Sequence, residues 1–178
     1  MNLNVILLGP PGAGKGTQAR LVARRLGIPH VSTGDLFREN VGKGTPLGLA
    51  AKSFMERGEL VRDEVVNEMV RQRLREPDCK EGFLLDGYPR TLEQAEELKE
   101  LLREEKEGCG PPVVINLGVS YTVIVQRLGG RRICPVCQRT YNLASQPPSN
   151  DSVCDDDGAA LQQRPDDRQE LWRALRHR

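Results

Sequence analysis

Nine residues near the start of the chain decide its fold: Gly9-Pro10-Pro11-Gly12-Ala13-Gly14-Lys15-Gly16-Thr17. The apolar run Val5–Leu8 precedes them and is typical of a short buried strand. In residues 18–26, which follow, apolar positions recur at helical spacing. A glycine-rich loop between a strand and a helix suits phosphate, because backbone N–H groups converge on one anion and the helix N-terminus adds partial positive charge.

The residues around the lysine narrow the type of phosphate site. We expect Lys15 to supply a mobile ammonium for the terminal phosphates of a triphosphate. The general motif has serine or threonine directly after the lysine as a Mg²⁺ ligand. Here Gly16 stands there, and the hydroxyl follows at Thr17. This variant resembles the loop of nucleoside monophosphate kinases more than that of GTPases or motor ATPases. The competing interpretation is a glycine-rich turn without a ligand.

Length and charge limit the remaining classes of protein. The chain has 178 residues and a formal net charge of +1. These values favour one domain with inserted lobes and no global field toward nucleic acid or anionic membrane. Its apolar runs are far shorter than the roughly 18 residues of a membrane helix, and no signal peptide opens the sequence. We therefore expect a cytoplasmic protein that binds neither nucleic acid nor membrane.

A second motif is Ser32-Thr33-Gly34-Asp35-Leu36-Phe37-Arg38, which follows a turn and short strand predicted at 27–31. It resembles the S-T-G-D-[LM]-[LF]-R segment of adenylate kinases, where that segment opens the lobe holding the monophosphate. The resemblance implies that Arg38 grips the AMP phosphate and that Thr33 lies against adenine; uridylate and cytidylate kinases usually have alanine there. From the residues alone, Asp35 also fits a helix N-cap and Arg38 a solvated surface charge.

Glycine and proline then break the chain into short helices, as a mobile lobe requires. These breaks fall at 42–48 and 58–62, and a further helix is predicted at about 63–75. The resemblance to adenylate kinases implies that the backbone of Glu59 and Val61 contacts AMP.

A third motif, Leu85-Asp86-Gly87-Tyr88-Pro89-Arg90, ends the apolar strand predicted at 82–86. In P-loop folds an acid at the end of a neighbouring strand holds Mg²⁺, usually through water. The competing interpretation of Asp86 is a strand-end turn residue. The string resembles the L-D-G-[FY]-P-R motif of adenylate kinases. That resemblance implies Mg²⁺ near Asp86, phosphate on Arg90, AMP contacts at Gly87, and adenine on Gln94.

The rest of the core alternates helix and strand. We predict a charged helix at 93–107, a third buried strand at 112–117 and a helix at 119–128. Such alternation indicates a parallel sheet with ligands at the carboxyl ends of its strands. The family resemblance implies that Arg127 stacks on the adenine of ATP and that Arg131 contacts phosphate; by themselves these arginines could serve solubility.

Two pairs of residues at C-x-x-[CD] spacing predict a tetrahedral zinc site. Its ligands would be Cys134, Cys137, Cys154 and Asp157. With four protein ligands and no open position, the zinc would be structural. Asp155 and Asp156 are rival ligands, and free thiols are the alternative to any metal. The spacing of the four expected ligands resembles that in adenylate kinases with a metal-bearing lid. Cys79 and Cys109 lack partners at ligand spacing, so we expect free thiols there.

The segment 163–170 resembles the R-x-D-D-x-x-E element that ends this lid, and the resemblance implies a catalytic role for Arg164. Two departures follow. Leu175 stands where the family has another phosphate-binding arginine, and the family continues with further helix, a final strand and a last helix. Without that strand, the strand at 113–117 is expected to be a sheet edge with unpaired backbone groups.

The expected fold is α/β: a P-loop nucleoside triphosphatase sheet flanked by helices, with an inserted monophosphate-binding lobe, a zinc-binding lid, and the final strand and helix missing. The expected parts are a P-loop core at 1–31, the AMP lobe at 32–62, core at 63–128, the lid at 129–165 and a truncated core helix at 166–178.

The expected activity, implied by the resemblance, is MgATP + AMP ⇌ 2 ADP by a monomer, with structural zinc. Positioning and charge neutralisation would do the work, without a covalent enzyme intermediate. The residues expected to converge on the moving phosphoryl group are Lys15, Arg38, Arg90, Arg131 and Arg164. The alternatives are another nucleoside monophosphate kinase and a catalytically impaired nucleotide- and zinc-binding protein.

Overall fold

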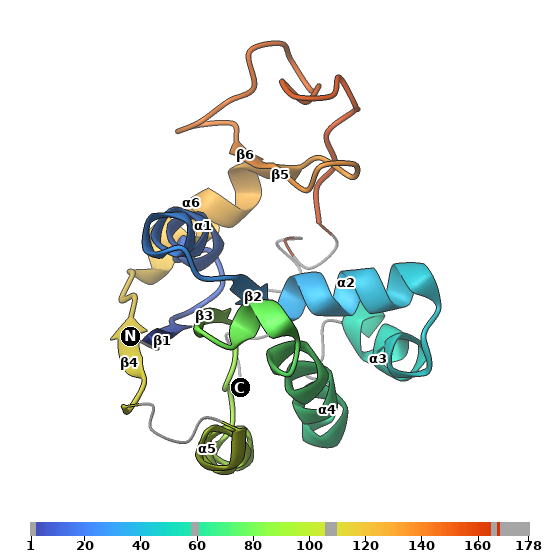
Figure 1. The fold of residues 1–178 in the computed structure, drawn as a ribbon. Helices are drawn as coiled ribbons and strands as arrows, with labels where there is room; N and C mark the ends of the chain where they lie inside the picture. The colour runs from blue at the N-terminus through green and yellow to red at the C-terminus, as the bar shows by residue number, and fades with distance from the viewer. Residues whose placement is uncertain (1–2, 58–60, 106–109, 165–166, 168–178) are drawn as a thin grey trace. The chain divides into compact units, whose positions relative to one another are not determined.

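A computed structural model describes residues 3–57, 61–105, 110–164 and 167 (Figure 1). The chain divides into two compact units. The first unit contains the chain up to Gly9 and from Gly14 to Gly118, and the second contains Pro10–Ala13 and the chain from Val119 onward. None of the described helices has the length and apolarity needed to cross a membrane.

The first unit is built on a parallel sheet with strand order β2-β3-β1-β4. Its strands are β1 (Leu3–Leu8), β2 (His30–Ser32), β3 (Gly82–Asp86) and β4 (Val113–Asn116). Five α-helices accompany them: α1 (Lys15–Leu26), α2 (Thr33–Lys43), α3 (Pro46–Arg57), α4 (Asp63–Leu74) and α5 (Leu92–Glu105), with a short 3₁₀ helix η1 at Pro77–Cys79. The α/β class and the parallel sheet expected from the sequence are confirmed.

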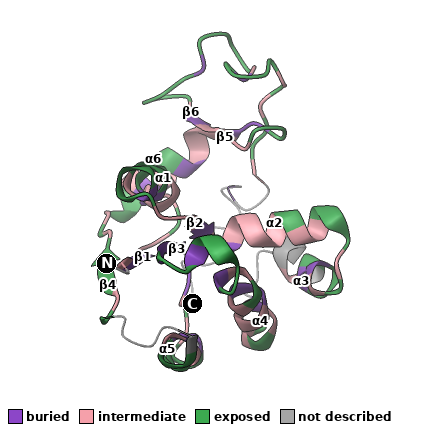
Figure 2. Ribbon diagram, in the orientation of Figure 1, coloured by how far each residue is buried: buried purple, intermediate pink, exposed green. Residues whose placement is uncertain are grey.

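Alternation along β1 separates two apolar layers, because successive side chains of a strand point to opposite faces. Val5 and Leu7 pack with Ala19 and Ala23 of α1. Ile6 belongs to the larger cluster, which Phe83, Leu85 and apolar residues of α4 and α5 complete. All five residues of β3 are buried, as Figure 2 shows for the centre of the sheet. Helices therefore cover both faces at the centre of the sheet, as parallel sheets require.

The strand β4 lies at one edge of the sheet, where it pairs with β1 alone among the described strands. Val113, Val114 and Ile115 are 47%, 55% and 40% exposed. The expectation of a buried strand here is wrong, because an apolar run shows a strand but not whether a neighbour covers it. The expectation of a sheet edge at this strand is confirmed.

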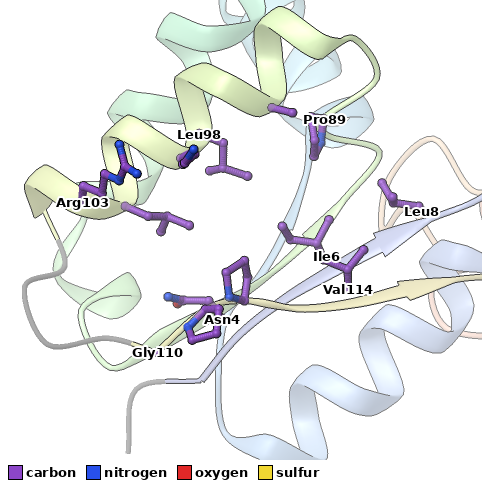
Figure 3. Close-up of a pocket in the computed structure, with 13 residues that line it drawn as sticks. Asn4, Ile6, Leu8, Pro89, Leu98, Arg103, Gly110 and Val114 are labelled. Carbon is purple, nitrogen blue, oxygen red and sulfur yellow. The ribbon is translucent and has the colours of Figure 1, made fainter.

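An apolar cavity of about 670 Å³ lies between α5 and the face of β1 and β4 (Figure 3). Asn4 lines it and is only 3% exposed, and its Oδ1 has no hydrogen-bond partner among the described residues. The lining consists of Asn4, Ile6, Leu8, Pro89, Ala95, Leu98, Lys99, Leu102, Arg103, Gly110, Pro111, Pro112 and Val114. Among the described residues, this edge of the sheet thus has both a strand with one neighbour and an incompletely filled apolar layer.

The second unit contains α6 (Tyr121–Gly130) and an antiparallel pair of strands, β5 (Arg131–Ile133) and β6 (Thr140–Asn142). Ala13, Ile124, Leu128 and Ile133 are buried in this unit. A small buried cluster around β5 and β6 consists of Cys134, Tyr141 and Cys154, with Ala159 and Leu161 packed against it. A segment with so little apolar core depends on other cross-links for its stability.

Candidate active site

Two glycines at the ends of the phosphate loop have backbone conformations that other residues rarely adopt. Gly9 has φ 138°, and a Cβ there would lie 2.7 Å from the carbonyl oxygen of Leu117. Gly14 has φ 96° and precedes α1 without a side-chain cap. Glycine has no side chain that could cap the first N–H groups of α1. Anion binding at a helix N-terminus requires such uncapped N–H groups. Lys15 Nζ donates to the Gly9 carbonyl at 2.8 Å.

The middle of the same loop belongs to the second unit, where it packs against α6. A Cβ at Gly12 would lie 3.1 Å from Cγ of Leu128. Arg127 donates from Nη1 to the carbonyl oxygen of Ala13 at 3.1 Å, with Gly12 O at 3.4 Å. The resemblance implies that Arg127 stacks on the adenine of ATP. In the structure its guanidinium lies beside the backbone of the loop residues in the same unit.

Asp86 ends β3 next to the start of the phosphate loop. The residue pairs in register with Leu7 of β1, and its carboxylate is nearly buried. Oδ2 lies 3.3 Å from His30 Nε2 and 3.4 Å from the position that a Cβ on Gly16 would take. The missing side chain at Gly16 therefore lets the carboxylate approach the first turn of α1, which brings an oxygen ligand next to the phosphate loop.

The turn after Asp86 is packed against Thr33. Gly87 has φ 81°, and a Cβ there would lie 2.9 Å from Thr33 Oγ1 and 3.0 Å from Arg90 Nη2. Thr33 is buried and donates from Oγ1 to the Gly87 carbonyl at 3.1 Å. Arg90 Nε donates to the same carbonyl at 2.7 Å. The structure thus brings Thr33, Gly87 and Arg90 together, as their expected common site requires.

Gln94 is buried beside this turn and makes two short hydrogen bonds. Its Oε1 accepts from the backbone N–H of Arg90 at 2.7 Å, and its Nε2 donates to Asp63 Oδ1 at 2.6 Å. Thr91 Oγ1 donates to the other carboxylate oxygen of Asp63 at 2.5 Å. Asp63 starts α4, so this network joins the beginnings of α4 and α5.

Arg38 points back along its own helix toward Asp35, with which it forms an ion pair. The N-cap of α2 is Ser32, whose Oγ accepts from the backbone N–H of Asp35 at 3.3 Å. The interpretation of Asp35 as the N-cap is wrong; it lies in the first helical turn, where the helix dipole favours an acid. Val61 is buried, and Glu59 lies outside the described residues.

Arg131 and Asp167 form a bidentate ion pair in the second unit. Arg131 Nε lies 2.6 Å from Asp167 Oδ2, and Nη2 pairs with Oδ1. Asp167 is 1% exposed. The guanidinium expected to bind phosphate is therefore oriented by a buried carboxylate. Arg164 is half-buried in the same unit, while Leu175 lies outside the described part of the chain.

The four residues with predicted zinc-ligand spacing converge: one ligand atom each from Cys134, Cys137, Cys154 and Asp157 lie within 4.8 Å of one another. Cys137 Sγ is 3.5 Å from Cys154 Sγ, and Cys134 Sγ is 3.1 Å from Asp157 Oδ2.

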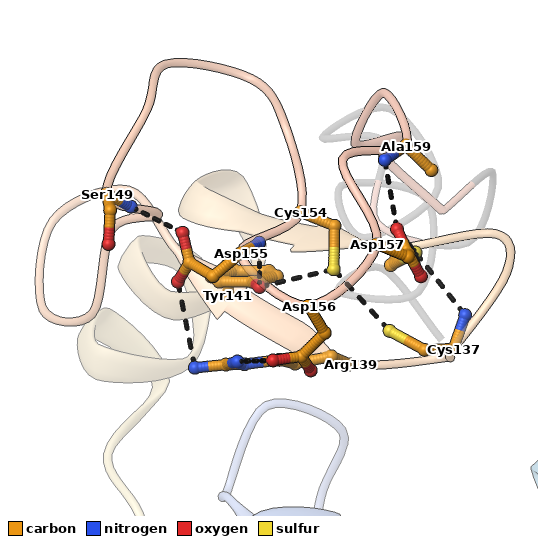
Figure 4. Close-up of polar contacts among 10 residues, drawn as sticks. Cys137, Arg139, Tyr141, Ser149, Cys154, Asp155, Asp156, Asp157 and Ala159 are labelled. Atoms are coloured by element: carbon orange, nitrogen blue, oxygen red, sulfur yellow. Dashed lines mark hydrogen bonds and ion pairs between the residues drawn. The ribbon is translucent and has the colours of Figure 1, made fainter.

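The rival acids Asp155 and Asp156 point elsewhere (Figure 4). Asp155 accepts from the backbone N–H of Ser149 at 2.8 Å, and Asp156 pairs with Arg139. Asp157 accepts instead from the backbone N–H of Ala159 at 2.9 Å, which is the main reason that its pKa falls to about 2. Asp157 is therefore a carboxylate at neutral pH and is the acid that stands beside the thiols.

Four residues next to the site were not identified from the sequence: His30, Asp63, Thr91 and Asp167. Each forms a hydrogen bond or ion pair with a residue distant in the chain, and local sequence spacing does not predict such a contact. Asp63 looks like an ordinary acid in the first turn of a helix, and His30 like part of a short strand. Only Asp167 stood within a recognised string, the one at 163–170.

A glycine loop between β1 and α1, with an acid at the end of the adjacent parallel strand, defines a nucleotide-binding protein of the P-loop class. The sequence also matches the adenylate kinase family profile over residues 7–175. It is 52% identical over 168 residues to an adenylate kinase of Caldanaerobacter subterraneus subsp. tengcongensis, covering 94% of this chain and 75% of that relative. The adenylate kinase of Bacillus subtilis is 52% identical over 170 residues, covering 94% and 76%. That of Methanocella arvoryzae is 49% identical over 167 residues, with the same two shares. The chain belongs to the adenylate kinase family.

Proposed function

We propose that this chain catalyses reversible phosphoryl transfer between MgATP and AMP to give two ADP. The observation that carries the proposal is the match to adenylate kinases over 94% of the chain at about half identity. The family profile matches residues 7–175 of this chain, and this range contains all the proposed site residues. The alternative of a binding protein without transfer, suggested by Leu175 and by the missing final strand and helix, is not favoured, because relatives named adenylate kinase match 94% of the chain at about half identity.

Charge neutralisation and positioning supply the catalysis, because phosphoryl transfer needs little covalent chemistry from the protein. Lys15 exchanges its hydrogen bond with the Gly9 carbonyl for the terminal phosphates of ATP. Arginine can hold two phosphate oxygens at once through its planar fork. We assign this role on the transferring phosphoryl group to Arg38, Arg90, Arg131 and Arg164.

The triphosphate site comprises the loop residues Gly12, Ala13, Gly14, Lys15, Gly16 and Thr17, with Arg127 at the adenine. The monophosphate site comprises Thr33, Arg38, Glu59, Val61, Gly87, Arg90 and Gln94. Support for the second set comes from the hydrogen bonds that join Thr33 to Gly87 and Arg90 to Gln94. A purine monophosphate would therefore meet an ordered base site and two arginines for its phosphate.

Asp86 is the residue that would hold Mg²⁺, through water. The donor fits, because carboxylate oxygen is a preferred Mg²⁺ ligand and Oδ2 lies against the first turn of α1 at Gly16. Bound Mg²⁺ would neutralise charge on the ATP phosphates. His30 Nε2 lies 3.3 Å from the same carboxylate oxygen and helps to orient it.

Cys134, Cys137, Cys154 and Asp157 would hold one structural zinc ion. Tetrahedral Zn–S bonds of about 2.3 Å place two sulfur ligands about 3.8 Å apart, and Cys137 and Cys154 are 3.5 Å apart. The ion would cross-link the two turns that carry these residues, beside an apolar cluster that is itself small. We further propose the five-part division at 1–31, 32–62, 63–128, 129–165 and 166–178, a monomer, and a cytoplasmic location.

Initial rates of ADP formation with AMP, CMP, UMP and GMP test the substrate assignment. We expect AMP to be preferred, with Lys15→Gln losing at least a hundredfold in rate while its fold is kept. Lys99→Gln, an exposed lysine of α5, is the matched control and keeps the rate. Equal rates for all four monophosphates, or an active Lys15→Gln variant, would overturn the proposal.

A further inference from the structure

The amide of Gln94 can take only one orientation in this structure. Its partner on one side is the backbone N–H of Arg90, which can only donate, so the atom at 2.7 Å must be the amide oxygen. Its partner on the other side is Oδ1 of Asp63, which can only accept when ionised, so the atom at 2.6 Å must be the amide nitrogen. The orientation therefore follows from the partners.

This orientation leaves Gln94 with a defined remaining capacity. An amide has two N–H donors and two acceptor lone pairs, and the described residues use one of each. The remaining donor and acceptor complement the N1 acceptor and 6-amino donor of adenine. A 6-oxopurine presents the reverse pair, an N1–H donor and an O6 acceptor. It could pair with Gln94 only after the amide turned over.

Turning the amide over would be opposed on both sides. Nε2 would then face the Arg90 N–H, and Oε1 would face the Asp63 carboxylate. Asp63 is itself held, since Thr91 Oγ1 donates to its second oxygen at 2.5 Å. Thr91 Oγ1 also accepts from the backbone N–H of Gln94 at 3.2 Å. The carboxylate is thus fixed relative to the amide that it orients.

We propose that Asp63 is a positioning residue that makes the monophosphate site select a 6-aminopurine over a 6-oxopurine, by locking the orientation of the Gln94 amide. This proposal rests on the proposed function only in that Gln94 reads the base of the monophosphate. The ligand classes that separate the two orientations are AMP and inosine monophosphate (IMP), which differ at C6 and at N1–H and present nothing new elsewhere.

The test compares the wild-type chain with Asp63→Asn, whose amide is the same size and can turn over together with Gln94. Glu64→Gln is the matched control, because Glu64 is an exposed acid in the same first turn of α4. Dissociation constants for AMP and IMP are measured calorimetrically without ATP, and kcat and KM are measured with MgATP.

We expect the AMP to IMP affinity ratio to fall about tenfold in Asp63→Asn, as when one charged hydrogen bond is weakened. The change should appear in KM, with kcat for AMP within about twofold, and Glu64→Gln should keep the wild-type ratio. An unchanged ratio in Asp63→Asn, or equal losses for both ligands, would overturn the proposal. If Asp63→Asn does not fold, Thr91→Val is tested instead, because it removes the hydrogen bond that holds the Asp63 carboxylate. This variant must also lower the AMP to IMP affinity ratio. A wild-type chain that binds AMP but forms no ADP would contradict the proposed function. The AMP to IMP affinity ratio would still decide the proposal about Asp63.

Discussion

Asp167, almost fully buried, holds the Arg131 guanidinium through two parallel hydrogen bonds, one of them 2.6 Å from Arg131 Nε to Asp167 Oδ2. Arg131 begins β5, directly after α6, so the pair ties the start of the strand pair to the described end of the chain. Such a pair is costly to break from one side, since the remaining charge is left partly buried without its partner.

Replacing Asp167 with asparagine therefore lowers the free energy of unfolding by about 3 kcal/mol. Urea unfolding followed by circular dichroism measures the change. Asp151→Asn removes an exposed carboxylate of the same unit and should change the free energy by less than about 0.5 kcal/mol. An Asp167→Asn variant as stable as the control would show that the ion pair does not stabilise the fold.

Purified protein should contain one zinc ion per chain, and a strong chelator should lower the melting temperature. Cys137→Ser should lose the metal, because a zinc site with three strong ligands binds more weakly than one with four. Asp156→Asn should keep it, since Asp156 pairs with Arg139 rather than facing the thiols. Elemental analysis of the three proteins decides this. Zinc retained by Cys137→Ser and lost by Asp156→Asn would reverse the ligand assignment.

Because the phenol of Tyr88 is buried, we expect the folded protein to lose stability at alkaline pH. Burial, followed by the negative charge of Asp63, raises the pKa of Tyr88 to about 12. Between pH 10 and 12 the unfolded chain releases the phenol proton while the folded chain retains it, so stability falls as the pH rises. From pH 9 to 11 the wild type should lose about 1 kcal/mol more than Tyr88→Phe. Parallel urea titrations of the two proteins measure this difference, and identical slopes would contradict it.

Asn4→Leu is expected to stabilise the protein by about 1 kcal/mol. The substitution removes a buried oxygen that has no hydrogen-bond partner among the described residues, and it places an apolar side chain in the cavity beside α5. Asn4→Asp puts a charge at the same place and should be destabilising. Thermal unfolding of both variants checks the signs, and a less stable Asn4→Leu would show that the amide contributes favourably there.

Much of the fold could be predicted from local pattern. The glycine loop, the strand that ends at Asp86 and the helix that starts at Asp63 each carry their signal within a few residues. The same holds for the zinc ligands, because each half of that cluster is a C-x-x-[CD] turn. The exposure of Val114 could not be predicted this way, since it depends on whether another strand pairs with β4.

The contacts that orient the site residues were also beyond the sequence. Gln94 meets Asp63 because α4 and α5 begin side by side, and Arg131 meets Asp167 because the chain returns to β5. Both contacts join residues far apart in the chain, where neither periodicity nor spacing gives a signal. The N-cap of α2 shows a local limit as well: Ser32 and Asp35 are both good capping residues, and the choice depends on where the helix starts.

The most direct test of the central claim is the nucleotide balance at saturating MgATP and AMP, followed by chromatography of the quenched reaction. We expect two ADP to form for each AMP consumed, at a turnover of about 1–100 s⁻¹, and no ADP to form when AMP is omitted. ADP formation that does not depend on AMP, or nucleotide binding without any ADP, would contradict the assignment of this chain as an active adenylate kinase.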